Sequence, residues 1–217
     1  MRTVAVLPVK TFSRAKQRLS DAVGEHDRRD LAAAMVADVL DALAAVDGLE
    51  AVVVVTAEPL AVGAADAAGA AVVHDPEEAG QSAAALRGIA AARELGAERV
   101  LAVPGDCPAL DAREVGALLA RERDHGVVIV PDRHGSGTNA LLLAPPDAIA
   151  PSFGVGSFAR HAALARAAGA TIRIARLASL ELDVDTPEDL AALHGALSAS
   201  AGAPRTRALL GGLPAGR

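Results

Sequence analysis

Near its amino terminus the sequence reads Thr3-Val4-Ala5-Val6-Leu7-Pro8-Val9-Lys10, an apolar run that ends on a cation. A short uncharged run rich in β-branched residues predicts a strand that is buried on both faces of a sheet. Similar runs recur at 51–56, 99–103 and 127–130, with helical periodicities between them. Because alternating strands and helices are typical of βαβ units, the sequence predicts an α/β fold with a mainly parallel, mixed sheet.

The remaining elements follow from periodicity and from helix boundary signals. Asp111 and Ser157 are placed to cap helices, and Gly96 to end one. We expect helices over about 25–46, 82–95, from 111 onward, 157–168 and 187–197, and further strands at 69–74, 139–143, 171–177 and 180–184. Residues 1–197 are predicted to form one domain. From 198 to 217 the chain is rich in Ala, Gly, Pro, Ser and Arg without clear periodicity, which predicts a disordered tail.

Composition restricts the class of protein. The formal net charge is -6, and the chain has three Phe and neither Trp nor Tyr, so neither a broad basic face nor an aromatic platform for nucleic acid is available. No apolar stretch is long enough for a membrane span, and the first residues do not resemble a secretory signal. A single cysteine excludes an internal disulfide. These features favour a cytoplasmic protein with a small anionic ligand.

The two lysines of the chain, Lys10 and Lys16, lie within seven positions of each other, whereas the other 19 basic residues are arginine. Arg18 follows in the same loop. A lysine ammonium is a compact cation on a flexible stem, which suits a phosphate that moves during a reaction. Because open α/β sheets bind ligands at the carboxyl ends of their strands, this loop is predicted to clamp phosphate. The alternative is a solvated basic loop.

Three carboxylates also follow predicted strands. Asp106 lies in a Pro-Gly-Asp-Cys-Pro turn, and Asp183 and Asp185 are two positions apart, so an extended segment would point both side chains to one face. Mg²⁺ prefers such oxygen ligands together with substrate phosphates, so the trio predicts a Mg²⁺ site. The competing interpretations are an Asx turn at Asp106 and helix capping at Asp185, although Thr186 could provide the cap instead.

Several familiar patterns do not hold. Residues 135–140 match a loose dinucleotide fingerprint but lead into a predicted strand, so the helix amino terminus that would hold a pyrophosphate is missing. The sequence contains no Walker-type phosphate loop. Cys107 is interpreted as a small buried residue because no base accompanies it. Among the histidines, only His161 follows a glycine loop in a way that suggests a site.

Four motifs, in this order along the chain, resemble a known family. They are Pro8-Val9-Lys10 with Ala15-Lys16-Gln17-Arg18-Leu19, Gly105-Asp106-Cys107-Pro108, Gly137-Thr138-Asn139-Ala140-Leu141, and Asp183-Val184-Asp185-Thr186-Pro187-Glu188-Asp189-Leu190. The set is similar to the 2-phospho-L-lactate / phosphoenolpyruvate guanylyltransferases of coenzyme F-420 biosynthesis. The likeness covers residues 3 to 196, and the Phe153-Gly154…Ser157 loop narrows it to this family.

The resemblance implies a three-layer nucleotidyltransferase fold like that of the nucleotide-diphospho-sugar transferases. It also implies transfer of GMP from GTP to the phosphate of a small phosphorylated three-carbon acid, with release of pyrophosphate. Positions that match Thr138, Gly154 and Ser157 bind the acid in the family. Those that match Asp106, Asp183 and Asp185 bind Mg²⁺, the expected cofactor, and Lys10, Lys16 and Arg18 would serve catalysis by balancing phosphate charge. The nucleotide is expected against Pro8, Lys10, Gly80, Ser82 and Gly105.

The sequence does not determine which nucleotide base is bound or which acid is the acceptor. The family often has Gly-Leu-Asn where this chain has Gly80-Gln81-Ser82, near the expected guanine. The Ala- and Arg-rich composition resembles that of GC-rich actinobacteria, where the likeness favours phosphoenolpyruvate over 2-phospho-L-lactate. A molybdopterin-type or sugar-phosphate nucleotidyltransferase and a non-catalytic nucleotide-binding module are also compatible with the motifs. A downstream enzyme of coenzyme F-420 biosynthesis is a conceivable partner, and the oligomeric state is not predicted.

Overall fold

The structure is a computed structural model that describes residues 1–14, 16–20, 23–124, 126–198 and 202–212. Its centre is a sheet in the order β3-β2-β1-β4-β6-β5-β7. The strands are β1 (Thr3–Val9), β2 (Ala51–Thr56), β3 (Ala71–His74), β4 (Arg99–Ala102), β5 (Gly126–Pro131), β6 (Thr138–Ala144) and β7 (Ile172–Ile174). β6 is antiparallel to both of its neighbours, and the other pairs are parallel. The predicted α/β fold with a mainly parallel mixed sheet is confirmed.

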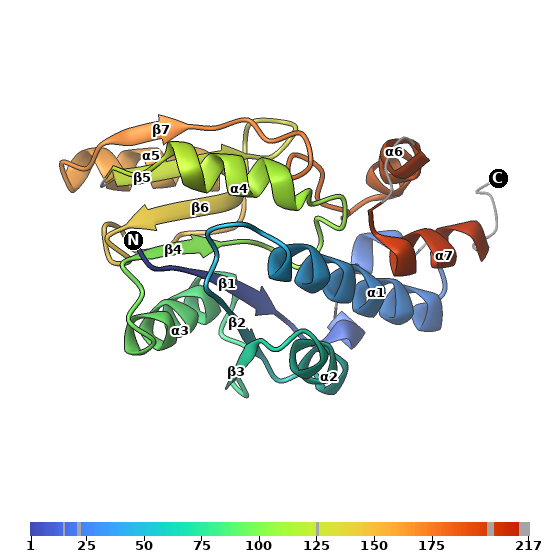
Figure 1. Ribbon diagram of the computed structural model, residues 1–217. Coiled ribbons are helices and arrows are strands. Elements are labelled where there is room, and N and C mark those ends of the chain that lie inside the picture. The colour runs from blue at the N-terminus through green and yellow to red at the C-terminus, as the bar shows by residue number, and fades with distance from the viewer. Residues whose placement is uncertain (15, 21–22, 125, 199–201, 213–217) are drawn as a thin grey trace.

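Helices cover both faces of the sheet and form the outer layers (Figure 1). They are α1 (Glu25–Ala44), α2 (Pro59–Ala67), α3 (Gln81–Glu94), α4 (Ala112–Arg121), α5 (Ser157–Ala167), α6 (Pro187–Ser198) and α7 (Pro204–Gly212), with short 3-10 turns at Phe12–Arg14 and Gln17–Leu19. Within the described residues, no helix combines the length and the hydropathy that a membrane crossing requires.

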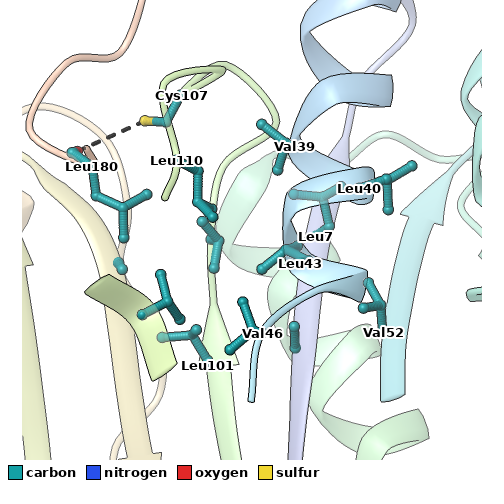
Figure 2. Packing of buried hydrophobic residues seen from close by; sticks show 14 of the residues in the cluster. Leu7, Val39, Leu40, Leu43, Val46, Val52, Leu101, Cys107, Leu110 and Leu180 are labelled. Carbon is teal, nitrogen blue, oxygen red and sulfur yellow. Dashed lines mark hydrogen bonds between the residues drawn. The ribbon is translucent and has the colours of Figure 1, made fainter. Parts of the chain in front are cut away.

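Alternation along the strands divides the core in two. Ala5 and Leu7 face α1, α2 and α4, whereas Val4 and Val6 face α3 and α5. Figure 2 shows the first of these layers, where Val39 and Leu43 of α1 lie with Leu7 and Leu101. In the second layer α3 packs so closely that a β-carbon on Gly88 would lie 2.3 Å from a methyl of Val6. Because both faces of β1 are buried, its carboxyl end is held in a fixed position.

A third apolar cluster braces the loop after β1. Leu19 and Val23 from that loop pack with Leu31 and Met35 of α1, with Val184, and with residues of α6 and α7. The cluster joins the lysine loop at one end of the chain to the late aspartates at the other.

The predicted disordered tail is wrong for residues 204–212, which form α7 beside α1 (Figure 1). The buried carboxylate of Asp38 accepts hydrogen bonds from the backbone N–H groups of Arg205 and Thr206 and so caps α7 from another helix. Leu210 packs into the third cluster. The predicted tail residues 199–201 and 213–217 lie outside the described residues.

Other predictions differ in detail. The expected strand at 180–184 does not form, and the one at 171–177 pairs only over β7, where it meets β5. Ser157 is the first residue of α5, and the residue that precedes the helix is Gly156, in a left-handed conformation. Helix α2 was not predicted, because its small residues give no clear apolar periodicity.

Candidate active site

A cleft of about 690 Å³ opens along the carboxyl ends of the strands. Its lining comes from the loops after β1, β3 and β4, from the β5–β6 hairpin, from the 153–157 loop and from the 183–189 segment. The volume lies within the range of small-molecule and cofactor sites.

The cleft gathers nearly all of the predicted site residues. Ser82 is the exception: it does not line the cleft, and its hydroxyl accepts a hydrogen bond from the backbone N–H of Phe153. The predicted site residues that do line the cleft are Pro8, Lys10, Lys16, Arg18, Gly80, Gly105, Asp106, Thr138, Gly154, Ser157, Asp183 and Asp185.

Lys16 lies at the centre of the charged part of the cleft. Its ammonium donates to the carboxylates of Asp106 at 2.6 Å and Asp185 at 3.2 Å. The side chain is only 6% exposed. Burial disfavours the charged form, but the two carboxylates outweigh burial, and the pKa of Lys16 is raised. Lys16 is therefore protonated at neutral pH. Lys10 and Arg18 are exposed in the same cleft.

Buried Val184 holds the two late aspartates in place. Its backbone N–H donates to the carbonyl of Asp106, and its side chain is fully buried between Asp183 and Asp185. Asp183 accepts a hydrogen bond from the amide of Asn139 at 3.2 Å, while Asp185 contacts Lys16. The predicted shared face of an extended strand is thus replaced by a pinned loop, but both carboxylates still line the cleft.

Of the two residues that the sequence offers as a cap for α6, Thr186 takes that role, and Asp185 pairs with Lys16 instead. The hydroxyl of Thr186 accepts from the backbone N–H of Asp189, and the Asp189 carboxylate accepts in return from the N–H of Thr186. This reciprocal pair is a capping box. Asp189 also forms an ion pair with Arg133 from the β5–β6 hairpin, so the capping box fixes the hairpin against the aspartate loop.

The donor set fits a hard divalent cation in its chemistry. Burial, followed by the neighbouring carboxylate of Asp106, raises the pKa of Asp183, which marks a crowded group of negative charges. Within Lys16, Asp106, Asp183 and Asp185, three carboxylates face one ammonium, so two negative charges have no counter-ion inside the group. Among the described residues, however, no three acidic, histidine or cysteine side chains already stand at metal-binding geometry, because Lys16 lies between two of them.

Two carboxylates from other loops anchor the chain after Lys10. Buried Glu58 accepts from the backbone N–H of Phe12 at 2.9 Å and also caps α2. Glu78 accepts from both the backbone N–H and the hydroxyl of Thr11. These bonds fix the direction in which Lys10 enters the cleft.

The opposite wall is a glycine loop held from behind. Gly154 and Gly156 have φ values of 99° and 71°, which favour glycine, and Ser157 is buried at the start of α5. The guanidinium of Arg160 donates to the carbonyls of Ser152, Phe153 and Val155. These carbonyls are thereby engaged by Arg160, which does not line the cleft, and a loop whose carbonyls are already paired suits an anion.

The β5–β6 hairpin is shaped by Asp132. Its carboxylate accepts from the backbone N–H groups of Ser136 and Gly137, each at 2.9 Å. A β-carbon at Gly137 would lie 2.6 Å from that carboxylate, so any other residue there would displace the Asp132 side chain that shapes the turn. The hairpin then delivers Thr138 and Asn139 to the cleft.

Asp75, after β3, carries a buried oxygen that has an ion pair but no hydrogen bond within the described residues. It is 5% exposed and lines the cleft, and no hydrogen-bond donor among the described residues serves its Oδ1. The Nε of Arg87 lies 3.4 Å from that oxygen as an ion pair. A buried carboxylate oxygen without a hydrogen bond is costly unless a ligand supplies a donor.

Cys107 is not a nucleophile. Its thiol is fully buried, donates to the carbonyl of Leu180 at 3.8 Å (Figure 2), and has a pKa well above the usual value because of burial and nearby carboxylates. The interpretation as a packing residue is confirmed.

Sequence reasoning did not identify four residues that shape the site. The Thr186-x-x-Asp189 spacing is a capping-box signal that could have identified Asp189, and an Asp before a glycine-rich turn could have identified Asp132. No local signal distinguishes Asp75 or Glu58, because their roles depend on contacts between loops that are distant in the sequence.

Comparison with known proteins finds guanylyltransferases as relatives of this chain. Residues 3–201 match the family described as "Guanylyl transferase CofC like". A phosphoenolpyruvate guanylyltransferase of Conexibacter woesei is 53% identical over 213 residues, which cover 97% of this chain and 96% of the relative. A 3-phospho-D-glycerate guanylyltransferase of Phenylobacterium zucineum is 39% identical, with 85% and 86% covered.

The fold has solved counterparts. A Desulfovibrio desulfuricans structure assigned to the nucleotide-diphospho-sugar transferases aligns with a TM-score of 0.77 at 19% identity, covering 98% of this chain and 95% of that one. This likeness confirms the predicted three-layer nucleotidyltransferase fold.

Proposed function

The chain belongs to the family of CofC-like guanylyl transferases, and on this premise we propose that it transfers GMP from GTP to the phosphate of phosphoenolpyruvate. An oxygen of the acid's phosphate bonds to the α-phosphorus of GTP as the bond from that phosphorus to the β-phosphate bridge breaks. The products are enolpyruvyl-diphospho-guanosine and pyrophosphate. The name of the relative at 53% identity supports phosphoenolpyruvate as the acceptor.

The observation that carries this proposal is the convergence of Lys16 with Asp106 and Asp185 in one cleft. Phosphoryl-type transfer depends mainly on positioning and on charge neutralisation. A phosphate monoester has a second pKa of about 6, so near neutral pH the acceptor is already a dianionic nucleophile and needs no general base. Lys10, Lys16 and Arg18 would offset the charge that develops on the leaving pyrophosphate.

Mg²⁺ is the proposed cofactor, with Asp106, Asp183 and Asp185 as its carboxylate ligands. When bound, the ion supplies charge neutralisation and orientation for the phosphates. The excess negative charge of this cluster of three aspartates supports the assignment. Lys16 now occupies part of that group, so its ammonium is expected to move toward the triphosphate when both ligands are present.

Sheet order supports a linear arrangement of the substrates. The order β3-β2-β1-β4-β6 places Asp75 at one end, the lysines and Asp106 in the middle, and Thr138 at the other end. Four strand spacings span roughly 19 Å, a length suited to a nucleoside triphosphate with a small acid beside its α-phosphate. We therefore assign the base to the β3 end, with Pro8, Gly80 and Gly105 against the nucleotide.

Asp75 supports guanine as the base. Guanine presents two adjacent donors, N1–H and the N2 amino group, and a carboxylate can accept from both. Adenine presents an acceptor at N1 instead, which a buried carboxylate repels. The buried Oδ1 has an ion pair with Arg87 but no hydrogen bond within the described part of the chain, so it retains the capacity to accept from such a donor.

Thr138, Gly154 and Ser157 are proposed to hold the phosphoenolpyruvate. They line the cleft near the start of β6, and the loop that carries Gly154 and Ser157 also meets the start of α3, where the N–H of Phe153 donates to Ser82. The left-handed glycines and the clamped carbonyls support an anion site in this loop. A hydroxyl and backbone N–H groups suit phosphate and carboxylate oxygens.

Two further acids are close in chemistry to phosphoenolpyruvate. The relative from Phenylobacterium zucineum is named for 3-phospho-D-glycerate, and 2-phospho-L-lactate differs from phosphoenolpyruvate only by two hydrogens. The likeness to a nucleotide-diphospho-sugar transferase at 19% identity concerns the fold alone, so a sugar phosphate or molybdopterin acceptor has weaker support. A non-catalytic binding module would use the same cleft without turnover.

The proposed function is tested by a matrix of pyrophosphate release. Four nucleoside triphosphates are combined with phosphoenolpyruvate, 2-phospho-L-lactate and 3-phosphoglycerate in the presence of Mg²⁺. We expect the highest rate with GTP and phosphoenolpyruvate. A higher rate with another acid would reassign the acceptor, and GTP binding without turnover in any combination would favour the binding module.

The proposed reaction belongs to coenzyme F-420 biosynthesis in the cytoplasm, where GTP and phosphoenolpyruvate are available. Its product carries a reactive diphosphate linkage, so a later enzyme of that pathway would receive it.

A further inference from the structure

His161 is buried behind the acceptor wall and does not line the cleft. It lies on α5, and its side chain is fully shielded from solvent. Nδ1 is 3.0 Å from the hydroxyl oxygen of Thr138, and Nε2 is 2.8 Å from the backbone nitrogen of Ser152. The imidazole therefore connects β6 to the segment that leads into the glycine loop.

The contact with Ser152 fixes the position of the imidazole proton. A backbone N–H can only donate, so Nε2 must accept and carries no proton. A neutral imidazole has one N–H, which is then on Nδ1 and points at Thr138. Burial, with the nearby Arg160 guanidinium, lowers the pKa of His161 to about 4, which is consistent with the neutral form.

The proton position decides what the Thr138 hydroxyl can do. Because Nδ1–H donates to Oγ1, the hydroxyl does not spend its own proton on the imidazole. That proton is available to an acceptor in the cleft, which Thr138 lines. In the other tautomer, Nδ1 would accept the hydroxyl proton, and Thr138 would present only lone pairs to an anion.

We infer that His161 is a positioning residue that makes Thr138 a committed hydrogen-bond donor to the anionic oxygens of the acceptor acid. This inference rests on the proposed acceptor site. His161 also fixes the second wall of that site, since it binds Ser152 and its ring packs edge-on against Phe153 at a centroid distance of 5.2 Å. One buried side chain thus sets both the donor on β6 and the loop that faces it.

A double-mutant cycle separates this role from simple packing. His161→Phe keeps a ring but removes both hydrogen bonds, and Thr138→Val removes the hydroxyl. Each single change is expected to raise the KM for phosphoenolpyruvate by roughly 10-fold or more, the scale of a lost hydrogen bond to a charged group, with less than a two-fold change in the KM for GTP. In the Thr138→Val background, His161→Phe should raise the KM for phosphoenolpyruvate by a smaller factor than it does in the wild type, because only its effect through Ser152 and the glycine loop remains.

A conservative variant provides the control. Asparagine at position 161 retains an N–H donor near the place of Nδ1, so His161→Asn should recover part of the acceptor affinity that His161→Phe loses. Two outcomes would show that His161 acts only through packing. In the first, the double variant raises the KM for phosphoenolpyruvate by the product of the two single factors. In the second, His161→Phe raises the KM for GTP as much as the KM for phosphoenolpyruvate.

The deciding experiment does not depend on turnover. Long-range ¹H–¹⁵N spectra of the imidazole-labelled wild type, with His161→Asn used to assign the signal, report which ring nitrogen is protonated. We expect protonated Nδ1 and unprotonated Nε2. An Nε2–H tautomer would overturn this inference and leave the proposed function untouched, whereas absent pyrophosphate release with every acid would overturn the proposed function and the role of Thr138 with it.

Discussion

At the scale of single residues, the site depends on charges whose partners lie far away in the chain. Lys16 contacts Asp106 and Asp185, which are 90 and 169 positions away. Its backbone adopts a left-handed conformation with φ of 55°, which is unusual for a side chain with a β-carbon. The two carboxylates hold the ammonium inside the cleft in spite of the cost of burial.

Asp75 is predicted to set the preference for guanine. Asp75→Asn replaces one acceptor oxygen by a donor that faces the guanine donors, so kcat/KM for GTP should fall by roughly 10- to 100-fold, the scale of a hydrogen bond to a charged group. The loss with ITP, which lacks the N2 amino group, should be smaller. Initial rates with both nucleotides check this prediction.

Glu77→Gln is the matched control for Asp75→Asn. Glu77 lies in the same loop, pairs with the same Arg87 and is 68% exposed, so its substitution should leave the ratio of GTP to ITP rates unchanged. If Asp75→Asn kept the wild-type ratio of GTP to ITP rates, Asp75 would have no role in recognising the base.

His161 is predicted to make stability depend on pH. Its folded pKa of about 4 lies below the usual 6.5 because of burial and Arg160, so the unfolded chain binds more protons in the interval between them. Stability should therefore fall as the pH drops from 6.5 toward 4, by about 2 kcal/mol between pH 7 and pH 5 from this residue.

Urea unfolding of the wild type and His161→Phe at both pH values isolates that contribution, since phenylalanine does not titrate. The wild type should lose about 2 kcal/mol more than the variant. Equal losses in the two proteins would show that the imidazole is not held neutral in the folded state.

At the scale of elements, α7 is stabilised by a cap that another helix supplies. Asp38 of α1 accepts from two backbone N–H groups at the start of α7 and pairs with Arg205. Asp38→Ala should lower the free energy of unfolding by about 1–2 kcal/mol, the usual worth of a helix cap. Denaturant unfolding provides the measurement.

Asp41 offers the comparison for Asp38. It lies on the same helix and pairs with the side chain of Arg205, and its own side chain is 54% exposed. Asp41→Ala should cost much less, because an exposed ion pair contributes little. Equal free energies of unfolding for Asp38→Ala and Asp41→Ala would show that the Asp38 cap does not stabilise the fold.

The elements that the sequence predicts best are those that local pattern alone determines. The apolar runs at 3–9, 51–56 and 127–130 form β1, β2 and β5 because a sheet buried on both faces requires such runs. The stretch 180–184 alternates apolar and charged residues as a strand would, but it has no strand partner, since Val184 is used to pin the aspartate loop to Asp106. Helix α7 could not be predicted because its cap, Asp38, lies in another helix.

At the scale of the whole molecule, the order of strands arranges the chemistry. Chain topology brings loops from positions near 10, 75, 106, 138, 154 and 185 to one edge of the sheet. The lysine loop and the carboxylates could be predicted as site residues from strand-end positions. The roles of Thr138, Gly154 and Ser157 came from the family resemblance, because a hydroxyl and two backbone positions leave no chemical signal in a single sequence.

Lys16 and the three aspartates, brought together from both ends of the chain, are proposed to form one centre for the triphosphate. The most direct measurement is the rate of pyrophosphate release from GTP and phosphoenolpyruvate with Mg²⁺, by the wild type and by Asp106→Asn in parallel. We predict release by the wild type and a loss on the order of 10²-fold or more in the variant. A variant that turns over as fast as the wild type would contradict a shared centre.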